Sequence, residues 1–332
     1  MILFLEVILS VYMLFLLTLI FGWSRIKQSR VNVNNPEKFY SILVAFRNEA
    51  KNLPGLIQSL KGLEFPKSNI EVILINDHSV DDFKKSIENL PENFKIIDSQ
   101  GQGKKMALST GVTVAKGEVI VTTDADCIVS GKWLKVIQQY FESEQAQLVF
   151  GPVAFHKQNS FFGQLQQVEF ASLIGSGAAT LQLGLPTMCN GANLAFLKSA
   201  YQDAGGYQDN IDLPSGDDEF LMHKIYKKAP EKVFYTKYRE SLVLTHAAPS
   251  AKIFYHQRKR WASKWKYYAS IKNSLLALLV ALFNVAIILS VISLFKMFPF
   301  SLVELLSIKV LLEAIFLSSV LHSMKKSLSL IA

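Results

Sequence analysis

The sequence is poor in cysteine, and it contains neither an internal repeat nor a low-complexity tract. Its two cysteines, Cys127 and Cys189, lack histidine partners at ligand spacing, which argues against a zinc site. Two cysteines in a compartment where thiols stay reduced also argue against a disulfide. No basic stripe runs through residues 38–250, so the net charge of +8 does not indicate nucleic acid as a partner.

The amino terminus lacks the features of a cleaved signal peptide. Ile2–Trp23 is apolar apart from Glu6, and it has neither a basic start nor a small-residue cleavage site. The stretch is long enough to cross a hydrocarbon core of about 30 Å. We therefore expect residues 1–23 to form a retained transmembrane anchor.

Two further apolar stretches lie near the carboxyl terminus. Leu275–Phe295 carries no charge before Lys296, whereas Phe298–Leu321 is interrupted by Glu304, Lys309 and Glu313. Charges inside a membrane are costly, but Lys309 and Glu313 are four residues apart and can pair on a helix. Residues 273–322 are therefore predicted to form transmembrane helices, with the second stretch the weaker of the two.

Basic residues predict the orientation of these spans. They cluster after the first span, before the second and after the third: Arg25, Lys27, Arg30; Arg258, Lys259, Arg260, Lys264, Lys266, Lys272; Lys325, Lys326. Positive charge favours the cytoplasmic side, where it also meets anionic lipid. The sequence therefore predicts an integral protein of the inner or plasma membrane, with residues 38–250 in the cytoplasm.

Residues 38–250 alternate between strand and helix patterns. The expected strands are Phe39–Phe46, Ile70–Ile75, Phe94–Ile97, Glu118–Thr123 and Gln147–Val153. The expected helices are Glu49–Leu60, Lys104–Ala115 and Lys132–Phe141. Such alternation predicts an α/β domain in which helices cover both faces of a mostly parallel sheet.

Two carboxylates follow the expected strand Glu118–Thr123, whose β-branched residues are typical of a buried strand. Asp124 and Asp126 come directly after it, where ligands gather at the carboxyl ends of parallel strands. Carboxylate oxygens suit Mg²⁺ or Mn²⁺, which are usually shared with substrate phosphates. A plain turn is the alternative, because Asp is common where strands end.

Two other strand ends are also rich in polar residues. The first strand runs into Asn48 and Glu49, and the second into Asp77. An Asp at such a position can accept hydrogen bonds from a ribose or a base. The alternative is that Ser79 or Asp81 caps a helix in the same loop.

The stretch Gly101–Lys105 does not satisfy the phosphate-loop pattern. Asp98 stands where that pattern needs glycine, and Lys105 stands where it needs serine or threonine. The stretch still provides a turn, a helix amino terminus and Lys104, and together these features favour the binding of an anion. A solvated helix start is equally compatible with these residues.

Acidic residues also precede an apolar helical run at Asp217-Asp218-Glu219. Acids at a helix start commonly complement the helix dipole. A general base, however, needs a carboxylate beside the reacting hydroxyl, and clustered acids raise one another's pKa. Both interpretations stay open on the residues alone.

Aromatic side chains lie among basic ones between Ile253 and Tyr268. Trp261, Trp265 and Tyr268 fall on one helical face, so residues 251–272 are predicted to form an amphipathic helix at the membrane surface. A guanidinium such as that of Arg260 is also suited to a diphosphate.

In this order, these stretches resemble the membrane-bound family 2 glycosyltransferases, which include cellulose, chitin and hyaluronan synthases. The resemblance covers about Tyr40 to Trp261. The nucleotide-binding Asp of the family corresponds to Asp77, whose neighbours Asn76 and His78 differ from the family pattern. A glycine-lysine element corresponds to Gly103, Lys104, Ala107, Leu108 and Gly111. The metal-binding acids correspond to Asp124 and Asp126, the base motif to Asp217-Asp218, and the last motif to Gln257, Arg260 and Trp261.

The resemblance implies a glycosyltransferase A fold and an inverting transfer from a nucleotide sugar, most often a UDP-sugar. It implies a divalent cation, Mg²⁺ or Mn²⁺, on Asp124 and Asp126, with Asp218 as the base beside Asp217. It also implies a substrate site that takes in Asp77, Asn48, Glu49, Lys104 and Asp124 and, at the membrane surface, Gln257, Arg260 and Trp261.

The expected acceptor is a lipid or a growing polysaccharide that receives one or a few sugars. Three spans with a charged third are few for a synthase that extrudes polymer. Two other classes stay open. A membrane-anchored nucleotidyl or phosphoryl transferase would use Asp124 and Asp126 without Asp218, and a non-catalytic scaffold would be expected to have lost acids that are present here.

Overall fold

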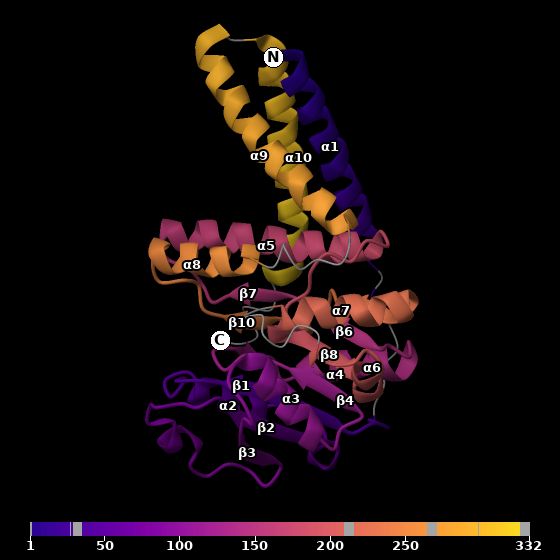
Figure 1. The fold of residues 1–332 in the computed structure, drawn as a ribbon, viewed down its shortest axis with the longest axis vertical. Coiled ribbons are helices and arrows are strands. Elements are labelled where there is room, and N and C mark those ends of the chain that lie inside the picture. Colours follow the sequence, from indigo (N-terminus) through magenta and orange to yellow (C-terminus); the bar gives the residue numbers. More distant parts are fainter. Residues whose placement is uncertain are drawn as a thin grey trace.

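The computed structural model describes residues 2–26, 28, 35–208, 216–263, 271–297 and 299–325. It has three tiers along its longest axis (Figure 1). A bundle of three helices stands at one end, namely α1 (Ile2–Arg25), α9 (Ile271–Met297) and α10 (Phe300–Lys325), and an α/β domain forms the other. Two helices between them, α5 (Phe161–Gln182) and α8 (Ala251–Ala262), lie across the axis of the bundle.

The central sheet has seven strands in the order β3-β2-β1-β4-β8-β6-β9. In chain order its strands are β1 (Tyr40–Phe46), β2 (Ile70–Asn76), β3 (Phe94–Asp98), β4 (Val119–Thr122), β6 (Leu148–Phe150), β8 (Leu194–Leu197) and β9 (Val233–Tyr235). Strand β8 runs antiparallel to β4 and β6, whereas the other neighbours are parallel. The expected mostly parallel sheet is confirmed.

A smaller sheet, in the order β5-β10-β7, lies between the central sheet and the α5–α8 tier. Its strands are β5 (Ile128–Val129), β7 (Val153–Phe155) and β10 (Val243–Thr245). The prediction of one strand over Gln147–Val153 is wrong, because β6 ends at Phe150 and β7 begins in the other sheet. A Cβ on Gly151 would lie 2.5 Å from Asn193 Nδ2, and Pro152 has no N–H to donate to a ladder.

The helices of the α/β domain are α2 (Leu53–Lys61), α3 (Lys104–Val114), α4 (Trp133–Ser143), α6 (Lys198–Asp203) and α7 (Asp217–Lys228). Helix α2 begins later than the expected Glu49. Pro54 occupies its first turn, where a missing N–H costs nothing. The amide of Ala50 instead donates to Asp81 across the neighbouring loop (2.8 Å).

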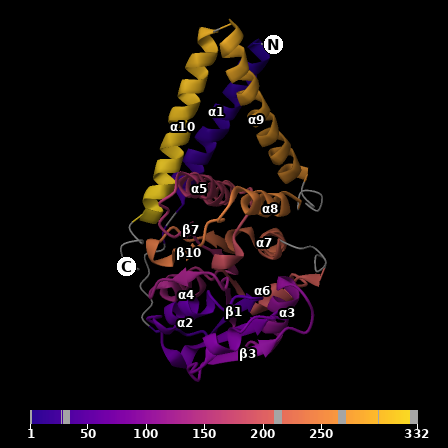
Figure 2. The same cartoon turned by 90° about the vertical axis from the view of Figure 1, so that its left-hand side faces the viewer.

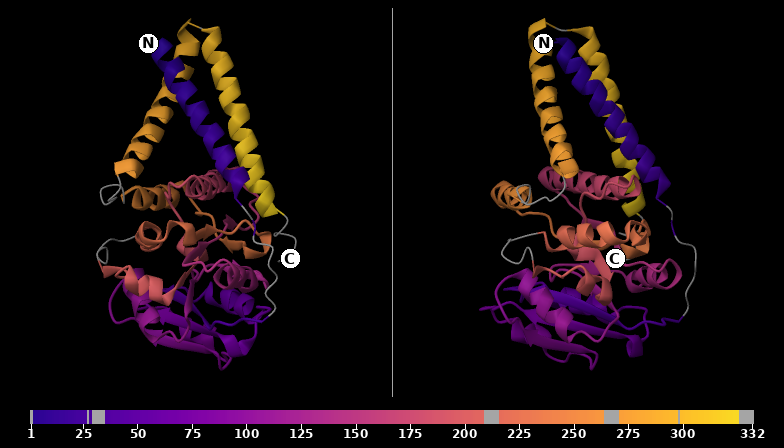
Figure 3. Two further views of the ribbon diagram at one scale, coloured as in Figure 1. Left: turned by 90° about the vertical axis from the view of Figure 1, so that its right-hand side faces the viewer. Right: turned by 45° about the vertical axis from the view of Figure 1, so that its right-hand side comes forward.

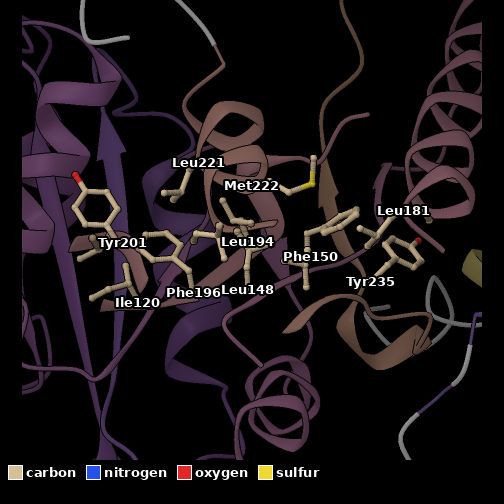
Figure 4. Packing of buried hydrophobic residues seen from close by; sticks show 14 of the residues in the cluster. Ile120, Leu148, Phe150, Leu181, Leu194, Phe196, Tyr201, Leu221, Met222 and Tyr235 are labelled. Atoms are coloured by element: carbon tan, nitrogen blue, oxygen red, sulfur yellow. The ribbon is translucent and has the colours of Figure 1, made fainter. Parts of the chain in front are cut away.

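Buried strands with both faces covered explain the apolar runs of the sequence. Leu43, Ile73 and Ile120 point into the core on one face of the sheet, and Ile42 and Val121 into the core on the other. Figure 4 shows part of the first core, in which Leu221 and Met222 of α7 meet side chains from the strands. Packing on both faces holds the strands in place, and with them the sheet edge from which the polar loops extend.

Helix α9 (Ile271–Met297) meets α1 (Ile2–Arg25) and α10 (Phe300–Lys325) at their far end and diverges from them toward the α5–α8 tier (Figures 2 and 3). Helices α1 and α10 stay together, and the rings of Trp23 and Phe316 lie 6.5 Å apart near that tier. Two charges of α10 have partners: Lys309 pairs with Glu313 (2.8 Å), as its spacing predicts, and Tyr12 of α1 donates to Glu313 (2.7 Å). Among the described residues, two helical stretches are long and apolar enough to cross a membrane, Ile2–Arg25 and Ser274–Ser293. The third span, in α10, stays a prediction.

Candidate active site

The parallel strands β1, β2 and β4 all end at one edge of the sheet, so the polar loops that follow them lie there. In register, Phe46 of β1 lies beside Asn76 of β2, and Leu43 of β1 beside Thr122 of β4. The loops that follow therefore carry Glu49, Asp77 and the Asp124–Asp126 segment on the same side. Thr245, at the end of β10, donates to Asp126 Oδ2 (2.9 Å) and fixes that carboxylate.

A cavity of about 1240 Å³ lies at this edge, between the α/β domain and the α5–α8 tier. Most of the site residues predicted from the sequence line it: Glu49, Lys104, Asp124, Asp126, Asp217, Asp218, Gln257, Arg260 and Trp261. Asn48 and Asp77 are not among its lining residues. Residues that come from separate sequence motifs thus share one cavity.

Lys104 joins two of these motifs. Its Nζ lies 2.6 Å from Asp124 Oδ1 and 3.7 Å from Asp217 Oδ2, and its side chain is 39% exposed. Burial alone would lower the pKa of Lys104, but the charges of Asp124 and Asp217 and the hydrogen bond to Asp124 raise it above its ordinary value. The ammonium therefore stays charged between the carboxylates.

The base motif begins α7. Gly216 precedes the helix at φ +86°, a backbone conformation that favours glycine, and Asp217 and Asp218 occupy the first turn. Asp218 Oδ2 accepts a hydrogen bond from the Gly191 amide (2.8 Å), and Thr122 of β4 donates to the Gly191 carbonyl (2.7 Å). Gly191 thereby couples the position of Asp218 to the strand that presents the metal motif.

Asp77 does not line the cavity but contacts Gly103, which does. Its buried carboxylate accepts the Gly103 amide at both oxygens (2.9 and 3.0 Å) and lies 3.2 Å from His78 Nδ1. Gly103 has φ +93° and is the N-cap of α3, so this contact fixes the start of the helix that carries Lys104. A direct contact of Asp77 with nucleotide stays a prediction.

Asn48 joins two loops at the same edge. Its side-chain Oδ1 accepts from the backbone N–H of Val80 (2.8 Å), and its backbone N–H donates to Ser79 Oγ (3.0 Å). With φ +57° it adopts the left-handed conformation that Asn tolerates better than most residues. Its assignment to the substrate site remains a prediction as well.

The α5–α8 tier closes the cavity from the other side. Helix α5 spans Phe161–Gln182 and α8 spans Ala251–Ala262. Arg258 of α8 donates through Nε (2.7 Å) and Nη2 to the two carboxylate oxygens of Glu169 on α5. The same guanidinium lies over the rings of Phe254 (4.4 Å) and Trp261 (4.2 Å).

Glu169 was missed by the sequence reasoning, because a single acid in the middle of a helix carries no motif. Arg258 was counted only as part of a basic cluster. The sequence does hold a signal for Arg258: Phe254 lies four residues before it and Trp261 three residues after it. On a helix, this spacing places the guanidinium and both rings on one face. Trp265 and Tyr268, predicted for the same helix, lie outside the described residues.

The acidic residues of the cavity fit a divalent cation. Burial raises the pKa of Glu49, the hydrogen bond from Asn52 lowers it, and the charges of Asp126 and Asp124 raise it further. These carboxylates therefore repel one another, which a cation would relieve. In the described part of the chain, no group of three or more His, Cys, Asp or Glu side chains is arranged to hold a metal, so remaining ligands would come from substrate and water.

The sequence and the fold of this chain are similar to those of known proteins. Residues 41–205 match the family described as glycosyl transferase family 2. A poly-beta-1,6-N-acetyl-D-glucosamine synthase of Staphylococcus epidermidis is 29% identical over 176 residues, 52% of this chain and 42% of that protein. A beta-monoglucosyldiacylglycerol synthase of Nostoc sp. is 29% identical over 254 residues, 74% of this chain and 52% of that protein. The chain spans about half the length of the curated relatives it matches.

Among solved structures, a mannosyltransferase from Pyrobaculum calidifontis, in complex with GDP-mannose and Mn²⁺, has a similar fold. The TM-score is 0.62 at 16% identity, and the match covers 98% of this chain and 97% of that one. The expected glycosyltransferase A architecture with additional helices is thus confirmed at the level of the fold. From this match and these relatives, residues 41–205 of this chain form a glycosyl transferase family 2 domain.

Proposed function

We propose that the protein is an inverting glycosyltransferase that moves a sugar from a nucleotide sugar, most often a UDP-sugar, to a lipid or polysaccharide acceptor at a membrane. The observation that carries this proposal is the convergence of the metal motif and the base motif on one cavity. Lys104 bridges them, 2.6 Å from Asp124 and 3.7 Å from Asp217. Family membership favours sugar transfer over nucleotidyl or phosphoryl transfer.

In this proposal, Asp124 and Asp126 hold a Mg²⁺ or Mn²⁺ ion together with the donor diphosphate. The bound cation would neutralise negative charge that develops on the leaving diphosphate. Lys104 and Arg260 add positive charge at the same place. The mannosyltransferase of similar fold binds GDP-mannose and Mn²⁺, which supports both a nucleotide-sugar donor and a cation.

Asp218 acts as the base. Its carboxylate takes the proton from the acceptor hydroxyl while the hydroxyl oxygen forms a bond to the anomeric carbon. The bond from that carbon to the diphosphate oxygen breaks on the opposite face, so the configuration inverts and the nucleoside diphosphate leaves with the bonding pair. The Gly191 amide, 2.8 Å from Asp218 Oδ2, orients the base for this step.

The chain is divided accordingly. Residues 1–23 form a membrane anchor and 38–250 the cytoplasmic catalytic domain. Residues 251–272 form an interfacial segment that includes α8 with Gln257, Arg260 and Trp261, although 264–270 lie outside the described residues. Residues 273–322 form carboxyl-terminal transmembrane helices. The two apolar helical stretches support membrane location. The glycan and glycolipid synthases among the relatives support the two acceptor classes.

Donor binding is tested by calorimetry of UDP with the detergent-purified full chain, with and without Mn²⁺. We expect binding that requires both Mn²⁺ and Asp126, and its loss in Asp126→Asn. Asp82→Asn, at an exposed acid paired with Lys85, is the matched control and should bind as the native protein does. Absence of UDP binding in every condition would refute the UDP-sugar assignment, and GDP would be titrated next.

Catalysis is tested with Asp218→Asn and a panel of UDP-sugars. We expect this variant to lose transfer and to retain nearly native UDP affinity, since Asp218 is not assigned to the donor diphosphate. Loss of UDP binding in Asp218→Asn would contradict the role of Asp218 as base.

A further inference from the structure

A short segment connects α5 to the residue that orients the base. The described residues 185–190 form neither helix nor strand, and residues 188–191 line the catalytic cavity. A segment of this kind is placed by the rigid elements that it contacts. Its contacts with α5 therefore decide where Gly191 lies.

Thr187 is bound to α5 by a side-chain hydrogen bond. Its Oγ1 lies 2.7 Å from Oγ1 of Thr180, which is 4% exposed. The Thr180 hydroxyl also donates to the Ser176 carbonyl oxygen, one turn earlier in α5 (2.8 Å). Because a hydroxyl has a single proton, Thr180 accepts in the contact with Thr187, and Thr187 is the donor.

The next residue of the segment contacts α5 closely. A Cβ on Gly177 of α5 would lie 2.7 Å from Met188 Cγ and 2.8 Å from the Met188 carbonyl oxygen. Only glycine allows the backbone of Met188 to approach the helix this closely. The hydrogen bond of Thr187 and the packing of Met188 thus hold the segment on the same part of α5.

This part of α5 is itself held by the helix bundle. A Cβ on Gly175 would lie 2.5 Å from Val320 Cγ2 of α10, and a Cβ on Gly22 of α1 would lie 2.6 Å from the Ala179 carbonyl oxygen of α5. Figure 1 shows α5 lying directly beneath the bundle. The helix that receives Thr187 is therefore a fixed support.

The other end of the segment reaches the base. The Gly191 amide donates to Asp218 Oδ2 (2.8 Å), and Thr122 of β4 donates to the Gly191 carbonyl oxygen (2.7 Å). Gly191 comes four residues after Thr187. Contacts with α5, β4 and α7 together therefore fix the amide that faces Asp218.

We propose that Thr187 is a positioning residue for sugar transfer. Its hydrogen bond to Thr180 holds the segment against α5, and the Gly191 amide at the end of this segment orients Asp218. Loss of the bond would let the amide and the base move apart, and a misplacement of about 1 Å can cost up to about a hundredfold in rate. This inference rests on the proposed role of Asp218 as base.

The experiment uses the detergent-purified full chain. Thr187→Val removes the donor, Thr180→Val removes the acceptor, and Thr187→Ser keeps the hydroxyl. Thr113→Val is the matched control, because Thr113 is an exposed residue of α3 whose hydroxyl donates within its own helix, to the Ser109 carbonyl oxygen (3.0 Å).

Three measurements are made on each variant. Hydrogen–deuterium exchange, resolved to single amides by mass spectrometry, reports on the Gly191 amide and needs no substrate. Calorimetry with UDP and Mn²⁺ gives the donor-site affinity. Release of UDP from UDP-N-acetylglucosamine or UDP-glucose, with an N-acetylglucosamine oligomer or dioctanoylglycerol as acceptor, gives kcat.

We expect Thr187→Val and Thr180→Val each to speed exchange of the Gly191 amide about fivefold, as for the loss of one hydrogen bond. Their kcat should fall about tenfold through misplacement of the base, with unchanged UDP affinity. Thr187→Ser and Thr113→Val should match the native protein in every measurement.

Unchanged exchange at Gly191 in Thr187→Val would overturn the inference, and so would a native kcat despite faster exchange. A loss of kcat in Thr187→Ser as large as that in Thr187→Val would overturn it too, because the hydroxyl would then have no role. If the native protein binds no UDP, the proposed function fails, whereas exchange at Gly191 still decides whether Thr187 holds this amide.

Discussion

Lys104 Nζ lies 2.6 Å from Asp124 Oδ1, so an ammonium occupies one side of the carboxylate to which we assign a divalent cation. The same group lies 3.7 Å from Asp217 of the base motif. In the absence of substrate, Lys104 therefore balances the charge of both acidic motifs. Binding of a cation and a diphosphate would redistribute these contacts, because the ammonium can then donate to phosphate oxygens.

Removal of this ammonium should strengthen binding of a bare divalent ion. We expect Lys104→Gln to bind Mn²⁺ about fivefold more tightly without nucleotide, which corresponds to about 1 kcal/mol for a partly exposed ion pair. Electron paramagnetic resonance of free Mn²⁺ gives this affinity. Lys85→Gln, which breaks an exposed pair with Asp82, is the control and should change nothing. Weaker Mn²⁺ binding in Lys104→Gln would contradict the shared role of Asp124.

The Glu169–Arg258 pair should act by positioning α8 at the cavity. We expect Glu169→Gln and Arg258→Gln each to lower kcat about tenfold with little change in UDP affinity, and the double variant to be no worse than the more damaged single one. Such non-additivity corresponds to a coupling of about 1–3 kcal/mol. The exposed Lys135–Glu64 pair provides the control cycle, where the effects should add. Additive losses at Glu169 and Arg258 would mean that each acts independently.

Glu71 should make stability depend on pH in the acid range. Burial raises the pKa of Glu71, but hydrogen bonds from Ser41, the Lys116 amide and Lys95 outweigh it and hold that pKa below its ordinary value of 4.5. A depressed folded-state pKa contributes stability above the unfolded-state value and loses it as the pH falls through the folded-state value.

We therefore expect Glu71→Gln to lower the free energy of unfolding by about 1–3 kcal/mol at neutral pH. The difference should shrink below pH 4.5, the ordinary value. Thermal unfolding in detergent, followed by tryptophan fluorescence at several pH values, measures it. Glu64→Gln, at a half-exposed acid, is the control variant. A difference that grows on acidification would refute the depressed pKa.

Gly22 should be required for the junction between α1 and α5. A Cβ at Gly22 would meet the Ala179 carbonyl oxygen at 2.6 Å, and backbone cannot yield as a flexible side chain can. We expect Gly22→Ala to cost about 1–3 kcal/mol as an overpacked contact. Ser24→Ala, two residues away on an exposed surface, is the control. An unchanged thermal midpoint for Gly22→Ala would show that α1 and α5 separate easily.

Much of the α/β domain could be predicted from local patterns. Continuous apolar runs such as those of β1 and β2 indicated buried strands, and the carboxyl ends of parallel strands indicated that Asp124 and Asp126 lie where ligands gather. The split at Gly151 and Pro152 could not be predicted in the same way. It depends on the approach of Asn193, which is distant in sequence.

The sequence by itself determined the apolar helical stretches, the mostly parallel sheet and the family, because periodicity and short motifs are local properties of the chain. The tertiary structure decided that Asp77 fixes the turn at Gly103, that Lys104 joins the two acidic motifs, and that Glu169 binds Arg258. Each of these contacts joins residues at least 20 positions apart, and its partner depends on how the sheet and helices pack. The physical reason is that side chains without a pattern of their own acquire a role only from the neighbours that folding brings to them.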